Sequence, residues 1–170
     1  IEQTLGSGGF GSVYKAHDTR LHRDVALKRL DKGQCEDSLR EQLMKEARVL
    51  ATMQHPNIVS VYDVSSHEAF DEIVMELAVG VSFDRLVKRH LLLQHDFRHI
   101  ARQVLNALSA AHKVGVLHCD LKPENIMLCM TNDDQYEVKM YDFGLSHPVS
   151  KEEASKSSKL MGSIYVMAPE

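Results

Sequence analysis

The start of the chain alternates short apolar runs with turns and then becomes helical. A glycine cluster at 6–11 lies between two short apolar runs, and residues 23–30 (RDVALKRL) form a further run with strand character. This pattern predicts a hairpin followed by a third strand. From about Glu36 to Met53, apolar residues recur every three or four positions, which predicts an amphipathic helix that ends at His55-Pro56-Asn57.

Two further apolar runs follow this helix. Residues 58–64 (IVSVYDV) and 72–77 (EIVMEL) both predict strands. The second run shows no polar alternation, so we expect it to be buried on both faces. The first half of the chain should therefore form a small sheet that carries one long helix.

Beyond Ala78 the pattern becomes mainly helical. Residues 83–89 (FDRLVKR) and the stretch from Phe97 to Val114 have helical periodicity, and Gly115 stands where a helix would stop. Two short apolar runs then flank polar loops and are joined through the turn-prone Asn132-Asp133-Asp134. The whole pattern predicts an α+β fold.

Composition excludes several classes of protein. The chain has 170 residues and a formal net charge of -4, with Lys and Arg scattered along it, so we expect no nucleic-acid partner. No apolar run approaches the roughly 20 residues of a membrane helix, and the first residues do not resemble a secretory signal. We therefore expect no membrane segment in this chain and a cytoplasmic location.

Cysteine and histidine offer little chemistry of their own. The three cysteines, Cys35, Cys119 and Cys129, are odd in number and widely spaced, so we expect reduced thiols rather than disulfides. We interpret the ten histidines as surface and structural residues and expect no metal site from them.

The glycine cluster has the pattern Gly-x-Gly-x-x-Gly-x-Val, with Gly6, Gly8 and Gly11 between two strands. Missing side chains let backbone amides approach phosphate oxygens. A dinucleotide-binding fold would continue into a helix, whereas this sequence continues as a strand. By itself the cluster could also be a hairpin without a ligand. Lys28 on the next strand could reach such phosphates and Glu46 could pair with it, although lone residues of both kinds are usually solvated.

The segment from His118 to Asn125 (HCDLKPEN) is the most specific string in the chain. It places an acceptor, a cation and an amide in one short loop, at Asp120, Lys122 and Asn125, which suits steering of a hydroxyl onto a phosphoryl group. Asp142 follows in Asp-Phe-Gly and offers the oxygen ligand that Mg²⁺ prefers. A polar loop without function could explain one of these residues, but hardly all of them.

In this order, the strings GSGGFGSV, VALK, HPNIV, HCDLKPEN, DFG and APE resemble the protein kinase family across nearly the whole chain. The resemblance implies a protein-kinase-like fold, with an N-lobe and hinge in residues 1–78 and a partial C-lobe in 79–170. The N-lobe would contain an antiparallel sheet and one long helix. Because the chain ends at APE, we expect the lower C-lobe helices to be missing and the polypeptide alone to transfer phosphate poorly.

The LKPEN form is similar to serine/threonine rather than tyrosine kinases, some of them bacterial, and Ser163 fits a Ser or Thr acceptor. The resemblance implies transfer of the γ-phosphoryl group of Mg-ATP to a protein substrate. Asp120 would orient the hydroxyl and Lys122 would touch the phosphoryl group, while Asn125 and Asp142 would hold Mg²⁺. The residues implied at the ATP site are Leu5, Gly6, Ser7, Gly8, Gly9, Phe10, Gly11, Val13, Ala26, Lys28, Glu46, Met75, Glu76, Ala78 and Met127.

Cys119 departs from the family pattern, because most regulated members have an arginine there that pairs with a phosphate on the activation segment. A thiol cannot form this pair. We therefore hypothesise that phosphorylation of the serines at 150–158 does not switch the protein on through Cys119. Cys119 could be a redox sensor, but we prefer to interpret it as a small, half-buried residue without redox function.

Two other functions stay open at this point. The first is a pseudokinase or nucleotide-dependent binding module, in which the same residues act as a switch without turnover. The intact Lys28, Asp120, Asn125 and Asp142 speak against it. The second is an inactive truncated fragment. Self-association of the parent protein is also open.

Overall fold

The computed structural model describes residues 1–8, 11–33 and 37–143 of the chain. These residues form two compact units. The first consists of Ile1–Gln54 and Val59–Ala78, and the second consists of His55–Ile58 and the described residues from Val79 onward. Gly9, Phe10, Cys35, Ser163, the serines at 150–158 and the APE motif lie outside the described residues.

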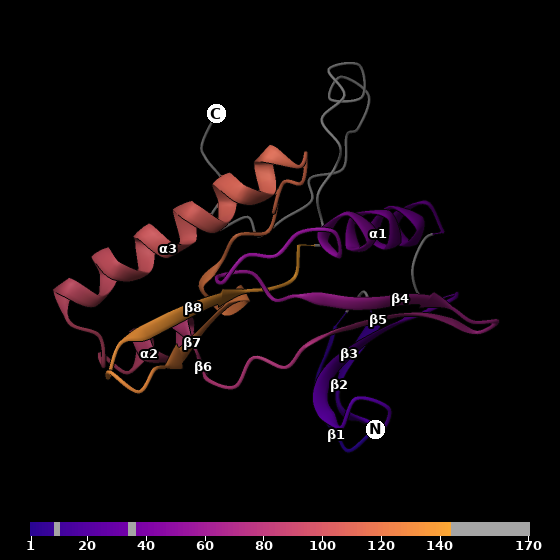
Figure 1. The fold of residues 1–170 in the computed structure, drawn as a ribbon, viewed down its shortest axis with the longest axis horizontal. Helices are drawn as coiled ribbons and strands as arrows, with labels where there is room; N and C mark the ends of the chain where they lie inside the picture. Colours follow the sequence, from indigo (N-terminus) through magenta and orange to yellow (C-terminus); the bar gives the residue numbers. More distant parts are fainter. Residues whose placement is uncertain (9–10, 34–36, 144–170) are drawn as a thin grey trace. The chain divides into compact units, whose positions relative to one another are not determined.

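The first unit contains a five-stranded antiparallel sheet with the order β1-β2-β3-β5-β4 (Figure 1). Its chain begins with the predicted hairpin and third strand, which are confirmed. The strands are β1 (Gln3–Gly8), β2 (Gly11–Asp18), β3 (Arg23–Asp31), β4 (Val61–Ser66) and β5 (Phe70–Glu76).

The predicted long helix is confirmed as α1 (Asp37–Leu50), which covers one face of this sheet (Figure 1). Its apolar side buries a cluster with the sheet residues Leu30 and Ile73. The helix ends at Leu50 rather than Met53, because the chain tightens into a turn in which the Thr52 hydroxyl donates to the Val49 carbonyl. The helical members of the cluster are Leu43, Met44 and Ala47.

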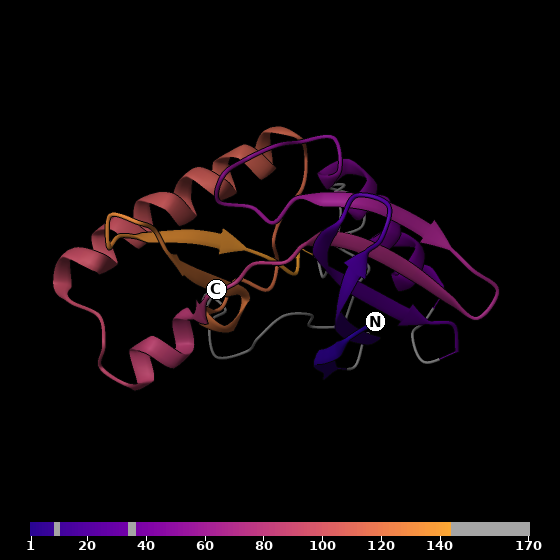
Figure 2. The ribbon, with the colours of Figure 1, turned by 60° about the horizontal axis from the view of Figure 1, so that its bottom comes forward.

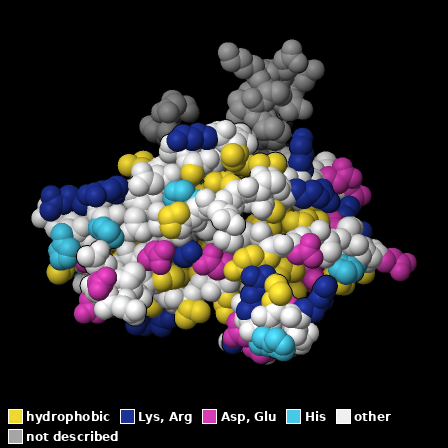
Figure 3. All heavy atoms as spheres, in the orientation of Figure 1, with side chains coloured by type: hydrophobic (Ala, Val, Ile, Leu, Met, Phe, Trp, Pro, Cys, Tyr) yellow, Lys and Arg dark blue, Asp and Glu magenta, His cyan; other side chains and the backbone are white. Residues whose placement is uncertain are grey.

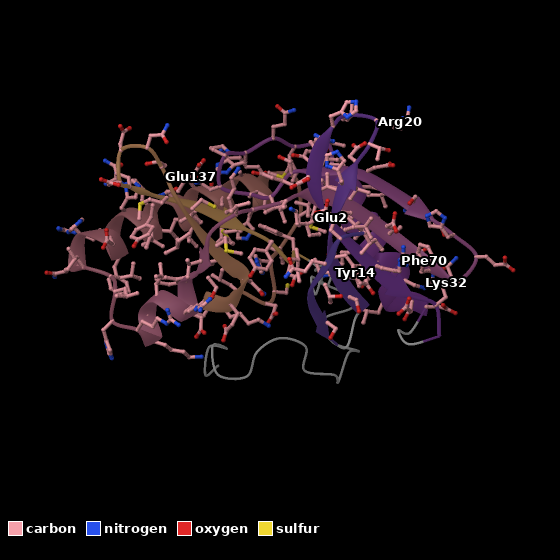
Figure 4. All side chains as sticks on the ribbon, turned by 90° about the horizontal axis from the view of Figure 1, so that it is seen from below. Glu2, Tyr14, Arg20, Lys32, Phe70 and Glu137 are labelled. Atoms are coloured by element: carbon pink, nitrogen blue, oxygen red, sulfur yellow. The ribbon has the colours of Figure 1, made fainter. Side chains whose placement is uncertain are left out.

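The expectation that the run 72–77 is buried on both faces is wrong. Along β5, Asp71 and Ile73 are buried, whereas the residues that alternate with them are only partly buried. On the sheet face opposite α1, the Arg29 guanidinium lies 3.9 Å from the Phe70 ring centroid and 3.1 Å from Glu72. Figure 4 labels Phe70 on this sheet. Polar and aromatic side chains therefore cover this face, which periodicity alone did not indicate.

The second unit contains a three-stranded antiparallel sheet, β6-β7-β8, and two helices (Figure 2). The long helix α3 begins before Phe97, because the Asp96 carboxylate accepts a hydrogen bond from the Leu93 N–H at 2.7 Å. It ends as predicted before Gly115, whose φ is 79°. The elements are β6 (Val81–Ser82), α2 (Phe83–Lys88), α3 (Gln94–Lys113), the 3-10 turn Pro123–Asn125, β7 (Ile126–Met130) and β8 (Tyr136–Met140).

His55–Ile58 belongs to the second unit although its sequence neighbours belong to the first. The buried Asn57 amide donates to the Gln103 side chain on α3 at 2.7 Å and to the Val138 carbonyl on β8 at 3.1 Å. Its own carbonyl accepts from the Met140 N–H at 2.9 Å. These bonds explain why a segment that the sequence placed in the N-lobe packs with residues beyond 79.

The surface mixes residue types, and no helix in the described ranges is long and apolar enough to cross a membrane. Figure 3 shows Lys and Arg interspersed with Asp and Glu on the visible face. Of the two cysteines that the structure describes, neither forms a disulfide. Cys119 is exposed rather than half-buried as expected, because the chain turns there with φ 53° while His118 and Asp120 are buried on either side.

Candidate active site

The glycine-rich hairpin is formed by the facing ends of β1 and β2, where Gly8 pairs with Gly11. Gly11 has a φ of 124°, and a Cβ on it would lie 2.0 Å from the Arg29 carbonyl oxygen on β3. Only glycine can take this conformation without moving the neighbouring strand. At Gly6, by contrast, a Cβ would meet nothing within 4 Å. The hairpin geometry therefore depends on Gly11, while Gly6 leaves an open backbone.

Lys28 lies on β3, where it pairs with Val13 on β2 and Ile73 on β5. Strand alternation puts Lys28 and Ala26 on the same face as Leu30, which is the face that α1 covers. Glu46 is a half-buried residue on α1 between the buried Leu43 and Ala47, and its Oε1 accepts from Gln42 Nε2 at 3.1 Å. The cation and the carboxylate thus come from the two elements that share this core.

Three of the residues implied at the ATP site lie at or just after the end of β5, namely Met75 and Glu76 in the strand and Ala78 two residues beyond it. Met75 is packed against the apolar core of the first unit. Glu76 is fixed to Ser60 twice, through its N–H at 2.9 Å and through its carboxylate at 3.2 Å. Within the described part of the chain, the backbone of Ala78 forms no hydrogen bond. Leu5 and Ser7 lie on β1.

The catalytic-loop residues come together in the second unit. Lys122 Nζ lies 2.5 Å from Asp120 Oδ2, and Asn125 Nδ2 donates to the same oxygen at 3.1 Å and to the Asp120 carbonyl at 2.9 Å. Asp120 and Asn125 are buried, with relative exposures of 5% and 4%. A buried carboxylate needs partners in place of water. Here a cation and an amide provide them through charge-assisted hydrogen bonds.

The backbone shapes this loop through one turn on each side of Asp120. The Asp120 N–H donates to the His118 carbonyl at 2.7 Å across Cys119, whose left-handed φ turns the chain. Pro123 then starts the 3-10 turn, which suits its fixed φ, and the Asn125 N–H donates to the Lys122 carbonyl at 3.0 Å. With these two turns, the side chains of Lys122 and Asn125 both reach Asp120 Oδ2.

Asp142 follows β8 and is exposed, whereas its neighbour Phe143 is buried. The Phe143 ring packs against His118, with 4.5 Å between the ring centroids. Asp142 has a left-handed φ of 58°, which lets the two neighbouring side chains point in different directions. Burial of the phenylalanine thus fixes the carboxylate outside the core. Met127 lies on β7 and pairs with Lys139 on β8.

His118 is a buried neutral imidazole. Burial lowers its pKa, although its hydrogen bonds and the Asp120 and Asp142 carboxylates act in the opposite direction. Its Nε2 lies 3.2 Å from the Tyr141 carbonyl and therefore carries the proton, which leaves Nδ1 as a buried atom without a hydrogen bond among the described residues. His118 thus connects the catalytic loop to the strand that leads to Asp142.

Tyr141 was missed by the sequence analysis, because an aromatic residue beside an apolar strand looks like ordinary core. Its N–H donates to the Asn125 carbonyl at 3.2 Å, and its hydroxyl donates to the Glu124 carbonyl. Burial raises the pKa of the Tyr141 phenol, and the Asp142 and Glu124 carboxylates raise it further. The hydroxyl therefore stays protonated and acts as a donor at neutral pH.

The side chains of Asn125 and Asp142 fit a magnesium ion. Because the Asn125 amide nitrogen is used on Asp120, its Oδ1 is left, and this oxygen forms no hydrogen bond with any described residue. Amide and carboxylate oxygens are the hard ligands that Mg²⁺ prefers. These two side chains could therefore hold the ion.

Two other sets of residues could be considered for metals. His95 and His99 stand four positions apart on α3, a spacing that the histidine analysis overlooked. Within the described ranges, the single group of three close ligand atoms comes from Glu2, His17 and Asp24 instead.

That second group already has a cation. Lys15 Nζ lies 3.2 Å from Glu2 Oε2 and 2.8 Å from Asp24 Oδ2. Hydrogen bonds to Asp24 and then Glu2 raise the pKa of Lys15. A metal would have to displace this ammonium group from an exposed surface, so we assign no metal there; Figure 4 labels Glu2 on this part of the first unit.

Comparison with known proteins agrees with this geometry. The protein kinase domain family model matches residues 1–170, and the chain belongs to this family. It is 36% identical over 172 aligned residues to a Clostridium acetobutylicum protein named "Probable serine/threonine-protein kinase", covering 100% of the chain and 26% of that protein. It is 36% identical over 154 residues to mouse NUAK family SNF1-like kinase 1, covering 89% of the chain and 23% of that protein.

A further relative is the serine/threonine-protein kinase PrkC of Bacillus subtilis, which is 31% identical over 173 residues, with 100% of the chain and 26% of that protein covered. The chain thus spans about a quarter of the length of these curated relatives. The predicted protein kinase family, its serine/threonine rather than tyrosine type and the protein-kinase-like fold are confirmed.

Proposed function

We propose that this chain carries the ATP-binding and catalytic residues of a protein serine/threonine kinase, which transfers the γ-phosphoryl group of Mg-ATP to a Ser or Thr hydroxyl of a protein. The observation that supports this most is the buried Asp120 carboxylate held by Lys122 and Asn125 in one loop. A buried ion pair alone can be structural, as Lys32 and Asp71 show in the first unit. The short loop that joins a carboxylate, a lysine and an amide supports the proposal because it combines a proton acceptor with a phosphate-binding cation.

In the proposed reaction, the substrate hydroxyl oxygen attacks the γ-phosphorus and the bond to the β-phosphate oxygen breaks, which releases ADP. Asp120 accepts or orients the hydroxyl proton, because its carboxylate is fixed and hydrogen-bonded. Lys122 can leave Asp120 to contact the transferring phosphoryl group. Bound between Asn125 and Asp142, Mg²⁺ would neutralise negative charge on the phosphates.

The first unit would bind the nucleotide. We propose that the backbone of the hairpin around Gly6 and Gly11 approaches the phosphates and that Lys28, supported by Glu46, contacts them. The backbone at Glu76 and Ala78 would bind adenine, and the remaining residues implied at the ATP site would surround the adenine ring. Gly9 and Phe10 stay part of the predicted ATP site. The protein would act mainly by positioning and charge neutralisation.

Activity is tested by transfer of radiolabelled phosphate from ATP to a generic protein substrate with the complete gene product. We expect Asp120→Asn and Asp142→Asn each to lower transfer by at least about 100-fold, since each removes a charged group that acts in the transition state. Asp133→Asn, in the exposed turn after β7, is the matched control and should retain full activity. Equal transfer by all four proteins would remove the enzyme hypothesis.

The acceptor, the location and the partners of this activity are proposals as well. We propose a protein acceptor, which membership of the protein kinase family supports. We also propose a cytoplasmic location and no nucleic-acid partner, the latter supported by the formal net charge of -4. A pseudokinase would bind nucleotide without turnover, so it is distinguished from the enzyme by the same assay. Self-association of the complete gene product can be measured by analytical ultracentrifugation.

A further inference from the structure

Tyr141 stands directly before the proposed magnesium ligand Asp142 and is bound to the catalytic loop by all three of its polar groups. Its N–H donates to the Asn125 carbonyl at 3.2 Å. Its carbonyl lies 3.2 Å from His118 Nε2. Its hydroxyl donates to the Glu124 carbonyl.

Two of the three bonds use the backbone and could be formed by any residue at this position. The hydroxyl bond requires tyrosine. It reaches the 3-10 turn Pro123–Asn125, which also positions the amide of Asn125. Tyr141 is therefore next to both side chains proposed to hold Mg²⁺. Asp142 follows Tyr141 in the chain, and Asn125 follows Glu124, whose carbonyl accepts the Tyr141 hydroxyl bond.

We propose that Tyr141 is a positioning residue, whose hydroxyl fixes the distance between the Asn125 and Asp142 side chains and so sets the affinity of this protein for the divalent cation of its nucleotide. This inference rests on the proposed function. The left-handed φ of 58° at Asp142 adds a reason, because a non-glycine residue keeps this conformation only when its surroundings hold it. Phe143 anchors Asp142 from one side through His118, and Tyr141 anchors it from the other.

Tyr141→Phe removes the hydroxyl and keeps the ring, so packing is retained. Loss of one hydrogen bond should weaken binding of Mn²⁺, used in place of Mg²⁺, to the complex with ADP by about three- to ten-fold, as measured by electron paramagnetic resonance. The Mg²⁺ concentration for half-maximal phosphate transfer should rise by a similar factor. The KM for the protein substrate should stay unchanged.

Tyr136→Phe is the matched control. Tyr136 begins the same strand, and its hydroxyl forms no hydrogen bond with any residue that the structure describes. This variant should bind Mn²⁺ like the wild type. Thermal unfolding of all three proteins separates a specific effect from general loss of structure, since a merely structural role would lower the melting temperature without changing cation affinity.

The outcomes separate the two proposals. If Tyr141→Phe and Tyr136→Phe bind Mn²⁺ equally in the presence of ADP, the positioning role of Tyr141 is overturned while the kinase function stands. If the wild type binds no Mn²⁺ with ADP and transfers no phosphate, the proposed function itself fails. A selective loss of cation affinity in Tyr141→Phe supports both.

Discussion

At the scale of single residues, the glycines of the hairpin between β1 and β2 differ in what they do. Gly11 has a left-handed backbone and its hydrogen faces the Arg29 carbonyl on the next strand, whereas Gly6 is surrounded by open space. Of Gly6 and Gly11, only Gly11 is thus closely approached by a neighbouring backbone. The motif treats these glycines alike, but the structure gives a folding role to Gly11 and no comparable constraint at Gly6.

Gly11→Ala should lower the free energy of unfolding by about 2 kcal/mol or more, because the methyl group must clear a carbonyl oxygen from an unfavourable φ. Chemical denaturation measures this loss. Gly6→Ala is the control and should change stability by no more than about 0.5 kcal/mol. If both variants unfold at the same denaturant concentration, the backbone constraint at Gly11 is not real.

The residues with charged, motif-forming side chains could be predicted from the sequence. Asp120, Lys122 and Asn125 are close in the chain, so a short loop brings them together whatever the rest of the fold does. Tyr141 could not be predicted, because its partners are set by the path of β8 beside the catalytic loop. The exposure of Cys119 was also missed, since it depends on a left-handed turn that a cysteine rarely makes.

At the scale of elements, α1 is joined to the sheet by a buried ion pair as well as by its apolar side. Arg40 donates to Asp71 Oδ2 at 2.6 Å, and Ser66 donates to the other Asp71 oxygen at 2.5 Å. Asp71 has a relative exposure of only 3%. Arg40 and Glu46 both lie on α1, so the ion pair between Arg40 and Asp71 also helps to position Glu46.

Asp71→Asn should lower the free energy of unfolding by about 2 kcal/mol at neutral pH, because two short hydrogen bonds to a buried charge are weakened. Burial alone would raise the pKa of Asp71, but hydrogen bonds from Ser66 and Arg40 outweigh it, so the pKa is lowered. A lowered folded-state pKa stabilises the protein above the unfolded pKa. The difference from the wild type should therefore shrink as pH falls below about 4.

Asp37→Asn is the matched control for this prediction. Asp37 also accepts from Arg40 at 2.6 Å, but its side chain is 80% exposed. Exposed ion pairs contribute little, so this variant should unfold like the wild type. Similar losses in both variants, or a difference between Asp71→Asn and the wild type that does not change with pH, would contradict the assigned role of Asp71.

Periodicity predicted most elements of the fold but not their ends or their environment. It predicted α1, α2, α3 and the strands of the first unit, whereas the runs that form β7 and β8 were recognised only as short apolar runs beside polar loops. The short β6 was not predicted, since two residues cannot show a period. The burial of β5 was misjudged because Arg29 and Glu72 pair across the exposed face. The attachment of His55–Ile58 depends on Asn57, whose partners are distant in sequence.

At the scale of the whole molecule, the residues of the proposed site belong to two compact units. The first contributes the glycine hairpin and Lys28, and the second contributes Asp120, Asn125 and Asp142. The motif order and the family match place these residues in one protein kinase domain. The central claim is that both sets act on the same magnesium–ATP complex, and this claim needs a measurement that addresses both.

The most direct measurement is the rise in melting temperature that magnesium and a non-hydrolysable ATP analogue give to the complete gene product. Ligand binding to the folded state stabilises it by an amount that grows with the logarithm of the ligand concentration divided by Kd. We predict a clear rise for the wild type, a smaller rise for Lys28→Met and for Asp142→Asn, and almost none for the double variant. A wild-type rise that neither substitution reduces would contradict the account.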